Sequence, residues 1–217
     1  IAGSEELFAV FAQLNIFYVS VLIILAFVLI WVSSIKWQLF VRETGYNVSI
    51  FSLMKWYTIG YFFNSFMPSF IGGDIVRSFH LGKHTANHKD AYAATFLERF
   101  TGLLAMCSMG LFFVVFGSEV TKGVEIAVIF VASCSFVLGF ICFSEQCSKW
   151  FFTFGRFLIK FCPHAKSKDK LLVLLGKIEE AMSFGRHNVP LFLKAMFWSF
   201  VFHILGVVNT YVAARAI

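Results

Sequence analysis

The sequence predicts an all-α protein: a polytopic membrane helix bundle with a broken, re-entrant helical hairpin and cytoplasmic amphipathic helices. Three observations support this fold class. Hydrophobic residues form 59% of the 217-residue chain and charged residues only 14%, a composition too apolar for a soluble domain. Uncharged runs long enough to cross a bilayer recur, and the basic residues gather between them. One apolar stretch is broken by a proline, a glycine pair and two charges.

The first apolar run extends from Ile16 to Ile35. It is long enough to cross a hydrocarbon core of about 30 Å. Lys36 and Trp37 follow it directly, a pattern typical of a cytoplasmic end with an aromatic anchor, and two glutamates precede it. We therefore expect a span that runs from outside to inside.

The second apolar stretch begins at Ser49, a suitable helix N-cap. Pro68 and the glycine pair that ends at Gly73 interrupt it, because proline and glycine disfavour a continuous helix. A second short helix is expected to start near Asp74. The chain should reverse between Phe66 and Gly73, either as a re-entrant hairpin or as two short, tilted spans. Either arrangement returns it to the side that it left.

Two longer helices are expected next, at 90–116 and 124–143, the second returning across the membrane. The last span should open with Asn188 as its cap and Pro190 in its first turn, where proline fits, and run to about Ile217.

The segment 144–188 is the most basic part of the chain and is expected to be cytoplasmic. Apolar residues at helical spacing predict two amphipathic helices in it, at 150–161 and around 171–182. Such helices lie on the membrane or against the bundle.

The chain is expected to be a single domain, residues 1–217. It begins without a start methionine and ends in an apolar stretch, so we expect a fragment that lacks N-terminal and C-terminal spans. Its N-terminus should lie outside the plasma (inner) membrane. The net charge of +6 fits cytoplasmic loops. No basic-aromatic motif of a nucleic-acid reader occurs, so nucleic acid is not an expected partner.

The segment Gly72-Gly73-Asp74, followed by Arg77, is the main candidate site. Charges at membrane depth are costly and usually mark a pathway or a site. A helix N-terminus presents unpaired N–H groups, and glycines let a phosphate approach the backbone closely. Arg77, one turn further on, could pair with a phosphate oxygen. Alternatively, Asp74 caps the helix and Arg77 is its i,i+3 partner.

Glu98 and Arg99 are a second pair of charges within an apolar helix. Adjacent helical residues point about 100° apart, so we expect only one of the two to reach Asp74 or Arg77. That contact would complete a buried four-charge network. In the alternative, the side chains extend to the cytoplasmic interface.

No pattern predicts a metal, a cofactor or catalysis. His80, His84 and His88 have helical spacing, but Gly82 should interrupt the helix and no acid or cysteine completes a site. The five cysteines form no C-x-x-C pair. Nucleophile elbow, P-loop and dinucleotide motifs do not occur, so an enzyme is not expected. His203 is expected to make an interhelical hydrogen bond.

The pattern Asn64-x3-Pro68-x3-Gly72-Gly73-Asp74-x2-Arg77, followed by Ala91-x6-Glu98-Arg99-x2-Gly102-Leu103, resembles the lysylphosphatidylglycerol synthase transmembrane-region family. The similarity extends over the whole chain and is strongest from about Lys36 to Leu104. The resemblance implies an integral inner-membrane protein with a flippase-like domain. In the best-known members this region moves an aminoacylated anionic phospholipid between leaflets, and the synthase chemistry belongs to a separate soluble domain.

The sequence therefore predicts a protein that binds and flips an anionic phospholipid or a lipid-linked glycan, such as a polyprenyl-linked lipid. The residues expected to bind it are Asn64, Gly72, Gly73, Asp74, Arg77, Glu98 and Arg99. The alternative is a non-transporting membrane scaffold for a partner glycosyltransferase or lipid synthase, favoured by the aromatic and basic residues of 150–186. A homo-oligomer is compatible with either function.

Overall fold

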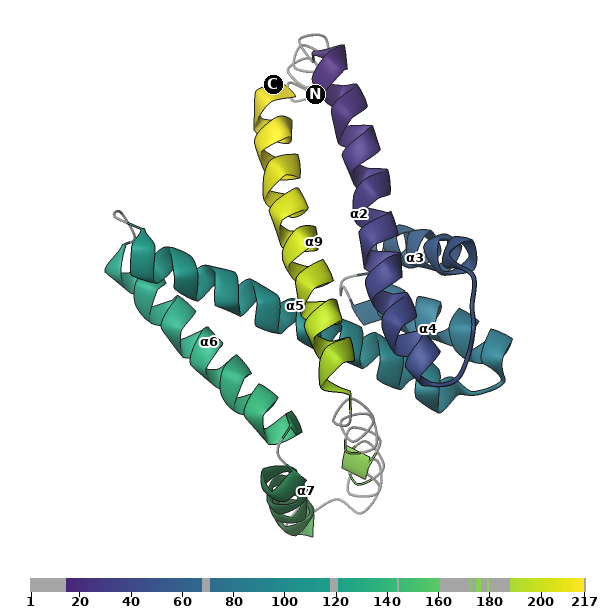
Figure 1. Ribbon diagram of the computed structural model, residues 1–217, viewed down its shortest axis with the longest axis vertical. Helices are drawn as coiled ribbons and strands as arrows, with labels where there is room; N and C mark the ends of the chain where they lie inside the picture. Colours follow the sequence, from purple (N-terminus) through teal and green to yellow (C-terminus); the bar gives the residue numbers. More distant parts are fainter. Residues whose placement is uncertain are drawn as a thin grey trace, which may run out of the picture.

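The computed structural model describes residues 15–67, 71–117, 121–143, 145–160 and 188–216, with the single positions 172, 175, 176 and 179. Within these ranges every regular element is a helix (Figure 1). In chain order they are α2 (Ile16–Glu43), α3 (Ile50–Asn64), α4 (Ile71–Thr85), α5 (His88–Phe116), α6 (Lys122–Phe143), α7 (Glu145–Lys160) and α9 (Val189–Ala216). Among them, α2, α5 and α9 are long and apolar enough to cross a membrane. The protein is thus an all-α membrane helix bundle, as predicted.

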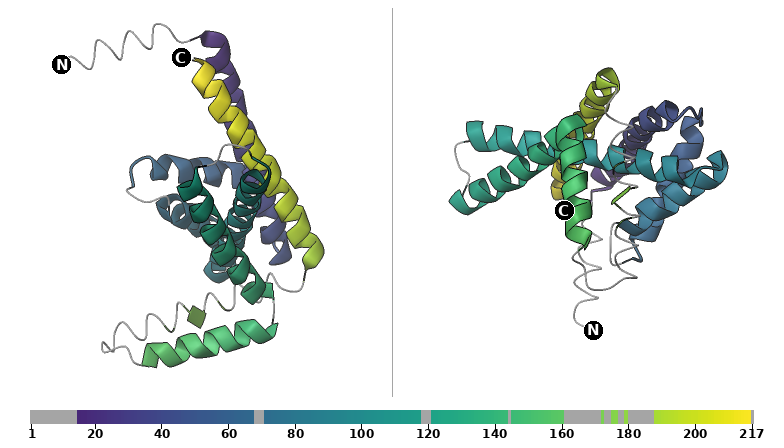
Figure 2. Two further views of the ribbon diagram at one scale, coloured as in Figure 1. Left: turned by 90° about the vertical axis from the view of Figure 1, so that its left-hand side faces the viewer. Right: turned by 90° about the horizontal axis from the view of Figure 1, so that it is seen from below.

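Helices α2 and α9 lie side by side and antiparallel, so that the two ends of the described chain meet (Figures 1 and 2). At one end, the Asn15 N–H donates to the Ala216 carbonyl over 3.3 Å. At the other end, the Asn188 amide donates to the Glu43 carboxylate over 3.1 Å. Asn188 also accepts from the Leu191 N–H over 3.1 Å, which confirms it as the cap of α9.

The first span is longer than the sequence predicts. Helix α2 continues past Ile35 to Glu43, and Lys36 and Trp37 lie inside it, almost completely buried. The prediction that Lys36 and Trp37 anchor the end of this span at the membrane interface is therefore wrong. The reason is tertiary: α3, α5 and α9 all pack against α2, and these contacts bury its last turns.

Helices α3 and α4 form the expected hairpin, which packs beside the lower half of α2 (Figure 1). The Ser49 side chain accepts from the Ser52 N–H and caps α3, as predicted. The chain turns back between Asn64, the last residue of α3, and Ile71, the first of α4. Pro68 lies outside the described residues. The reversal is confirmed, although α4 begins three residues before Asp74.

Glycines bring the two hairpin helices into backbone contact. A Cβ atom on Gly60 would lie 2.8 Å from the Gly73 carbonyl oxygen, and one on Gly73 would overlap the Gly60 carbonyl oxygen. Gly82 does not end α4, contrary to the expectation, because the helix runs on to Thr85. A side chain at Gly82 would overlap His88, which opens α5.

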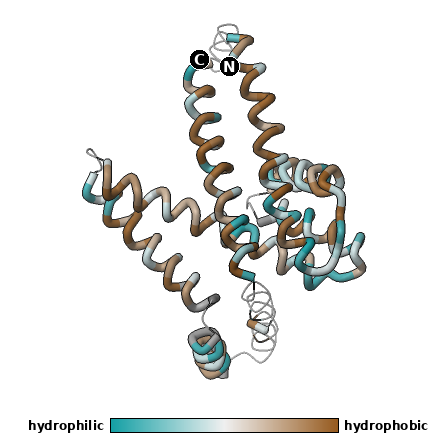
Figure 3. The backbone as a smooth tube through the Cα atoms, in the orientation of Figure 1, coloured by the Kyte–Doolittle hydropathy of each residue, from teal (hydrophilic) through white to brown (hydrophobic). Residues whose placement is uncertain are grey.

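Helix α5 crosses the α2–α9 pair steeply, and α6 folds back along it (Figure 1). α6 covers the predicted segment 124–143, and its crossing of the membrane stays a prediction. α7 confirms the first predicted amphipathic helix and lies across the end of α6 (Figure 2). The second, around 171–182, falls almost wholly outside the described residues. Apolar residues run along α2, α9 and α6, whereas hydrophilic ones gather on α4 and α7 (Figure 3).

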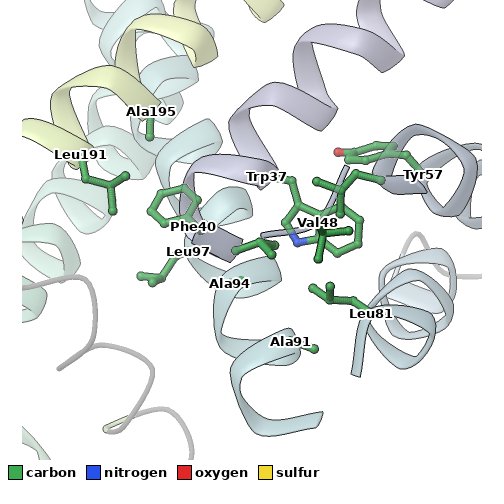
Figure 4. Close-up of a cluster of buried hydrophobic side chains, with 12 residues drawn as sticks. Trp37, Phe40, Val48, Tyr57, Leu81, Ala91, Ala94, Leu97, Leu191 and Ala195 are labelled. Carbon is green, nitrogen blue, oxygen red and sulfur yellow. The ribbon is translucent and has the colours of Figure 1, made fainter. Parts of the chain in front are cut away.

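The core lies where α3, α4, α5 and the start of α9 surround the lower half of α2 (Figure 4). Its central side chain is Trp37, packed between Val48, Tyr57 and Leu81, with Ala91 and Ala94 of α5 beneath. Burial of large aromatic side chains supplies much of the free energy of packing. The same side chains form one wall of the charged cluster described below.

Replacing Gly73 with alanine is expected to destabilise the protein by about 1–3 kcal/mol, because the added methyl group forces the hairpin helices apart. Gly206→Ala is the control, since a Cβ atom at this helical glycine of α9 meets open space. Thermal unfolding in detergent should show a lower melting temperature for Gly73→Ala only. Equal melting temperatures would contradict the close approach.

Candidate functional site

Five charged side chains from three helices meet beside this core. Lys36 comes from α2, Asp74 and Arg77 come from α4, and Glu98 and Arg99 come from α5. Each is within salt-bridge distance of at least one opposite charge. Ion pairs between helices explain how charges persist in a membrane bundle, because an unpaired charge there is costly.

The inner part of the cluster is buried. The Glu98 carboxylate, 1% exposed, pairs with Lys36 Nζ at 2.8 Å and with Arg77 Nη2 at 2.6 Å. The Arg77 side chain is also 1% exposed. Removing one partner from such a group strands an uncompensated charge, which destabilises by about 3–5 kcal/mol. Glu98 therefore ties α2, α4 and α5 together.

Two aromatic rings lie against the Arg77 guanidinium. Its central carbon lies 4.7 Å from the Trp37 ring centroid and 4.3 Å from that of Tyr57. The two rings stand nearly perpendicular, at 79°. Cation–π attraction of this kind is strongest where water is excluded. Arg77 is nevertheless not saturated: among the described atoms, its Nη1 is buried with no hydrogen-bond partner.

The outer part of the cluster reaches the surface. Asp74 accepts from Arg99 Nε at 2.8 Å and from Arg99 Nη2 at 2.7 Å, a two-pronged contact. It also accepts from Arg77 Nε at 2.9 Å. Asp74 is 22% exposed and Arg99 is 45% exposed. Asp74 and Arg99, here called the clasp, cover the buried Arg77.

The cluster carries an excess of positive charge. Among the residues that the structure describes, the three cations Lys36, Arg77 and Arg99 face the two carboxylates of Asp74 and Glu98. One positive charge is left over, and a buried arginine donor is left unpaired. The excess charge favours an additional anion at the cluster.

A narrow cleft adjoins the clasp, and in this conformation it is too tight to admit a water molecule. Its walls combine hydrogen-bond donors from α3 and α4 with the clasp itself; the lining residues are Tyr57, Gly60, Tyr61, Asn64, Gly73, Asp74, Arg77 and Arg99. Hydroxyl, amide and guanidinium groups can all donate to a phosphate oxygen. The chemistry of the cleft thus suits an anion.

Packing of the α3–α4 hairpin is the role of Asn64, Gly72 and Gly73 in this conformation. The Gly73 N–H donates to the Asn64 side-chain oxygen over 2.7 Å, so this backbone donor of the first turn of α4 is already bonded. Both glycines are buried, Gly72 against Met67 and Gly73 against Gly60. The glycine pair therefore does not form the open phosphate-binding turn that the sequence suggested, because the hairpin closes over it.

The expectation that only one of Glu98 and Arg99 joins the cluster is wrong. Glu98 points inward to Lys36 and Arg77, and Arg99 lies at the cluster's edge. The long arginine side chain spans the angular offset between neighbouring helical positions and reaches Asp74. The alternative in which these charges simply extend to the interface is wrong for the buried Glu98.

Two further parts of the cluster were not expected from the sequence. Lys36 follows an uncharged run, as an interfacial lysine does, and only its position inside a continuous helix would have revealed it. Tyr57 lies in an ordinary apolar stretch.

The predicted interhelical contact of His203 is confirmed, since its Nε2 lies 2.9 Å from the Gly102 carbonyl oxygen, between α9 and α5. No metal-ligand group occurs among the described residues, the three histidines included.

Replacing Glu98 with glutamine is expected to lower stability by about 3–5 kcal/mol, because Lys36 and Arg77 both lose their buried partner. Adding Lys36→Met should recover part of the loss. Arg156→Gln, which breaks an exposed ion pair with Glu179, should cost less than about 1 kcal/mol. Denaturation in detergent measures all of these changes. A double variant whose loss equals the sum of the single losses would argue against a shared network.

Comparison with known proteins assigns the chain to one family. The sequence model of the lysylphosphatidylglycerol synthase TM region matches residues 2–217. Curated proteins and solved structures give no significant match. The matched region contains all five charged residues of the cluster and every described helix. The chain therefore belongs to the lysylphosphatidylglycerol synthase TM region family, whose name ties it to lipid handling.

Proposed function

We propose that this protein binds the headgroup of an anionic phospholipid or of a lipid-linked glycan and moves it between the leaflets of the plasma (inner) membrane. The headgroup binds at the clasp, and its phosphate completes the charge of the cluster. The family membership supports a lipid substrate. The main support for the proposal is that exposed apolar side chains border the clasp.

The clasp opens onto apolar surface. Phe96 and Leu103 lie one turn before and one turn after Arg99 on α5, and both are exposed. Ile75, the neighbour of Asp74 on α4, is exposed too. A headgroup that reaches Arg99 past these side chains can leave its acyl chains in the hydrocarbon. A water-soluble anion would gain nothing from these apolar side chains. A lipid matches both surfaces, because its headgroup suits the charged clasp and its acyl chains suit the apolar residues.

The remaining features of the proposal follow from the same cluster and from the charge pattern. Binding and translocation need no bond to be made or broken, and we propose that the chain is not itself an enzyme. The basic segment 144–188 would face the cytoplasm and the N-terminal end of α2 the outside.

Arg99→Gln should slow translocation of phosphatidylglycerol roughly tenfold, because one charge-assisted contact to the phosphate is lost. A leaflet-resolved assay in proteoliposomes measures the rate. Arg156→Gln is the matched control: it removes an arginine of the same exposure, 46% against 45%, from α7. Unchanged translocation in a folded Arg99→Gln protein would remove the clasp from the mechanism.

The alternative function, a membrane scaffold for a glycosyltransferase or lipid synthase, has support from α7. This helix exposes Trp150 and Phe154, which stack on each other 5.7 Å apart, and Phe157. An aromatic face of this kind suits a protein partner or the membrane surface.

If the scaffold function is correct, the double variant Trp150→Ser, Phe154→Ser should lose a co-purifying enzyme, whereas Arg99→Gln should retain it. Affinity purification from membranes followed by mass spectrometry decides between them. A partner that stays bound to the α7 variant would contradict the scaffold, and phosphatidylglycerol translocation by the purified chain alone would favour transport.

A further inference from the structure

Asp74 holds Arg99 in the way that a phosphate would. Two carboxylate oxygens meet two nitrogens of one guanidinium, at 2.7 and 2.8 Å. Arginine uses the same fork for phosphate oxygens. The carboxylate thus occupies the position on Arg99 that an arriving phosphate needs.

Access to the cluster follows a fixed order. Arg99 is 45% exposed, whereas Arg77 behind it is 1% exposed. Asp74, Arg77 and Arg99 line the same narrow cleft. A headgroup therefore meets Arg99 first. It reaches the Nε of Arg77, which donates to Asp74 over 2.9 Å, only when the carboxylate moves away.

The two parts of the cluster differ in how readily they exchange partners. The Asp74–Arg99 pair lies at the edge of the cluster, where Arg99 is 45% exposed, so an arriving anion can replace the carboxylate there and keep the arginine paired. The Glu98 pairs with Lys36 and Arg77 are buried, and breaking them strands charges. The inner pairs therefore stay fixed while the clasp opens.

We propose that Asp74 is an internal competitor for the headgroup site: its carboxylate occupies Arg99 in the empty protein, and a lipid phosphate binds by displacing it from Arg99. The inference rests on the proposed function, since it takes the lipid to bind at the clasp. Phosphate then accepts from Arg99 in the place of the carboxylate, and it neutralises the excess positive charge of the cluster. When Asp74 returns to Arg99, it expels the phosphate and resets the site.

A competitor of this kind weakens binding of the lipid and speeds its release, so removing the competitor should do the reverse. Without the Asp74 charge, the phosphate loses its bidentate rival for Arg99 and only the more distant Glu98 carboxylate, 3.9 Å from Arg99 Nε, remains, so the lipid binds more tightly. It also leaves more slowly, because the bidentate rival no longer takes its place on Arg99. A merely structural Asp74 gives the opposite result for binding, because its loss would loosen both arginines.

The test measures binding of phosphatidylglycerol that carries a fluorescent acyl chain to the purified chain in neutral detergent micelles. Diacylglycerol with the same label shows binding that needs no phosphate. Asp74→Asn should lower the Kd for phosphatidylglycerol about fivefold to tenfold, as removal of a direct competitor does. Glu125→Gln is the control: it removes a charge from the first turn of α6 and should stay within about twofold of wild type. Asp74→Glu keeps a competing charge and should bind the lipid more weakly than Asp74→Asn does.

Transport kinetics provide a second readout of the same variants. In proteoliposomes, Asp74→Asn should lower both KM and kcat for phosphatidylglycerol translocation. A Kd that is unchanged or raised in folded Asp74→Asn and Asp74→Ser proteins would overturn the inference and leave the proposed function standing. A wild-type protein that binds phosphatidylglycerol no better than diacylglycerol would overturn the proposed function together with the inference.

The wild-type protein allows a test that does not depend on the folding of any variant. Solid-state NMR can follow the assigned dipolar contact between the Asp74 carboxyl carbon and the Arg99 guanidinium nitrogens. Saturating phosphatidylglycerol should abolish this contact and create one between lipid phosphorus and Arg99. Persistence of the full Asp74–Arg99 contact with the lipid bound would overturn the inference.

Discussion

Burial of the Arg77 guanidinium is the constraint on which the rest of the site depends. A charge in this position is tolerated only with partners, and each partner comes from a different helix. Trp37 of α2 and Tyr57 of α3 lie against it, and it donates to Glu98 of α5 and to Asp74, one turn away on α4. A single side chain thus fixes the relative positions of four helices.

This arrangement separates the cluster into a fixed and an exchangeable part. Close packing of α3 on α4, made possible by Gly60 and Gly73, holds Arg77 against the aromatic rings. The inner carboxylate is fully enclosed, whereas the outer carboxylate lies at the surface beside Arg99. The buried pairs of Glu98 stabilise the bundle, whereas the outer pair of Asp74 and Arg99 can exchange partners. A lipid site needs both, because it must survive in the membrane and still release its ligand.

The apolar surroundings of the clasp connect the electrostatics to the membrane. Arg99 shares its face of α5 with Phe96 and Leu103, which are exposed. In a soluble protein such a surface would favour aggregation or a partner. In a membrane bundle such a surface suits lipid, and the clasp lies beside it. The proposed lateral entry of a headgroup is a consequence of this placement.

Much of the fold could be predicted, because its signals are local. Hydropathy located the long helices, Ser49 and Asn188 marked helix starts, and the proline–glycine interruption located the hairpin. The site could be predicted in part: charges at 74, 77, 98 and 99 stand out in an apolar sequence. Lys36 and Tyr57 could not be recognised, because a lysine after an apolar run and a tyrosine within one have common alternative explanations.

The sequence by itself determined the class of the protein, the break between α3 and α4, and the charged residues that need partners. These follow from hydrophobicity, backbone conformation and the high cost of an isolated charge in a membrane. Only the tertiary structure decided which partners meet. It placed Glu98 inside and Arg99 outside, used Gly73 for helix packing and buried Lys36. Pairing between distant helices depends on how their faces pack, and residue spacing within one helix does not specify it.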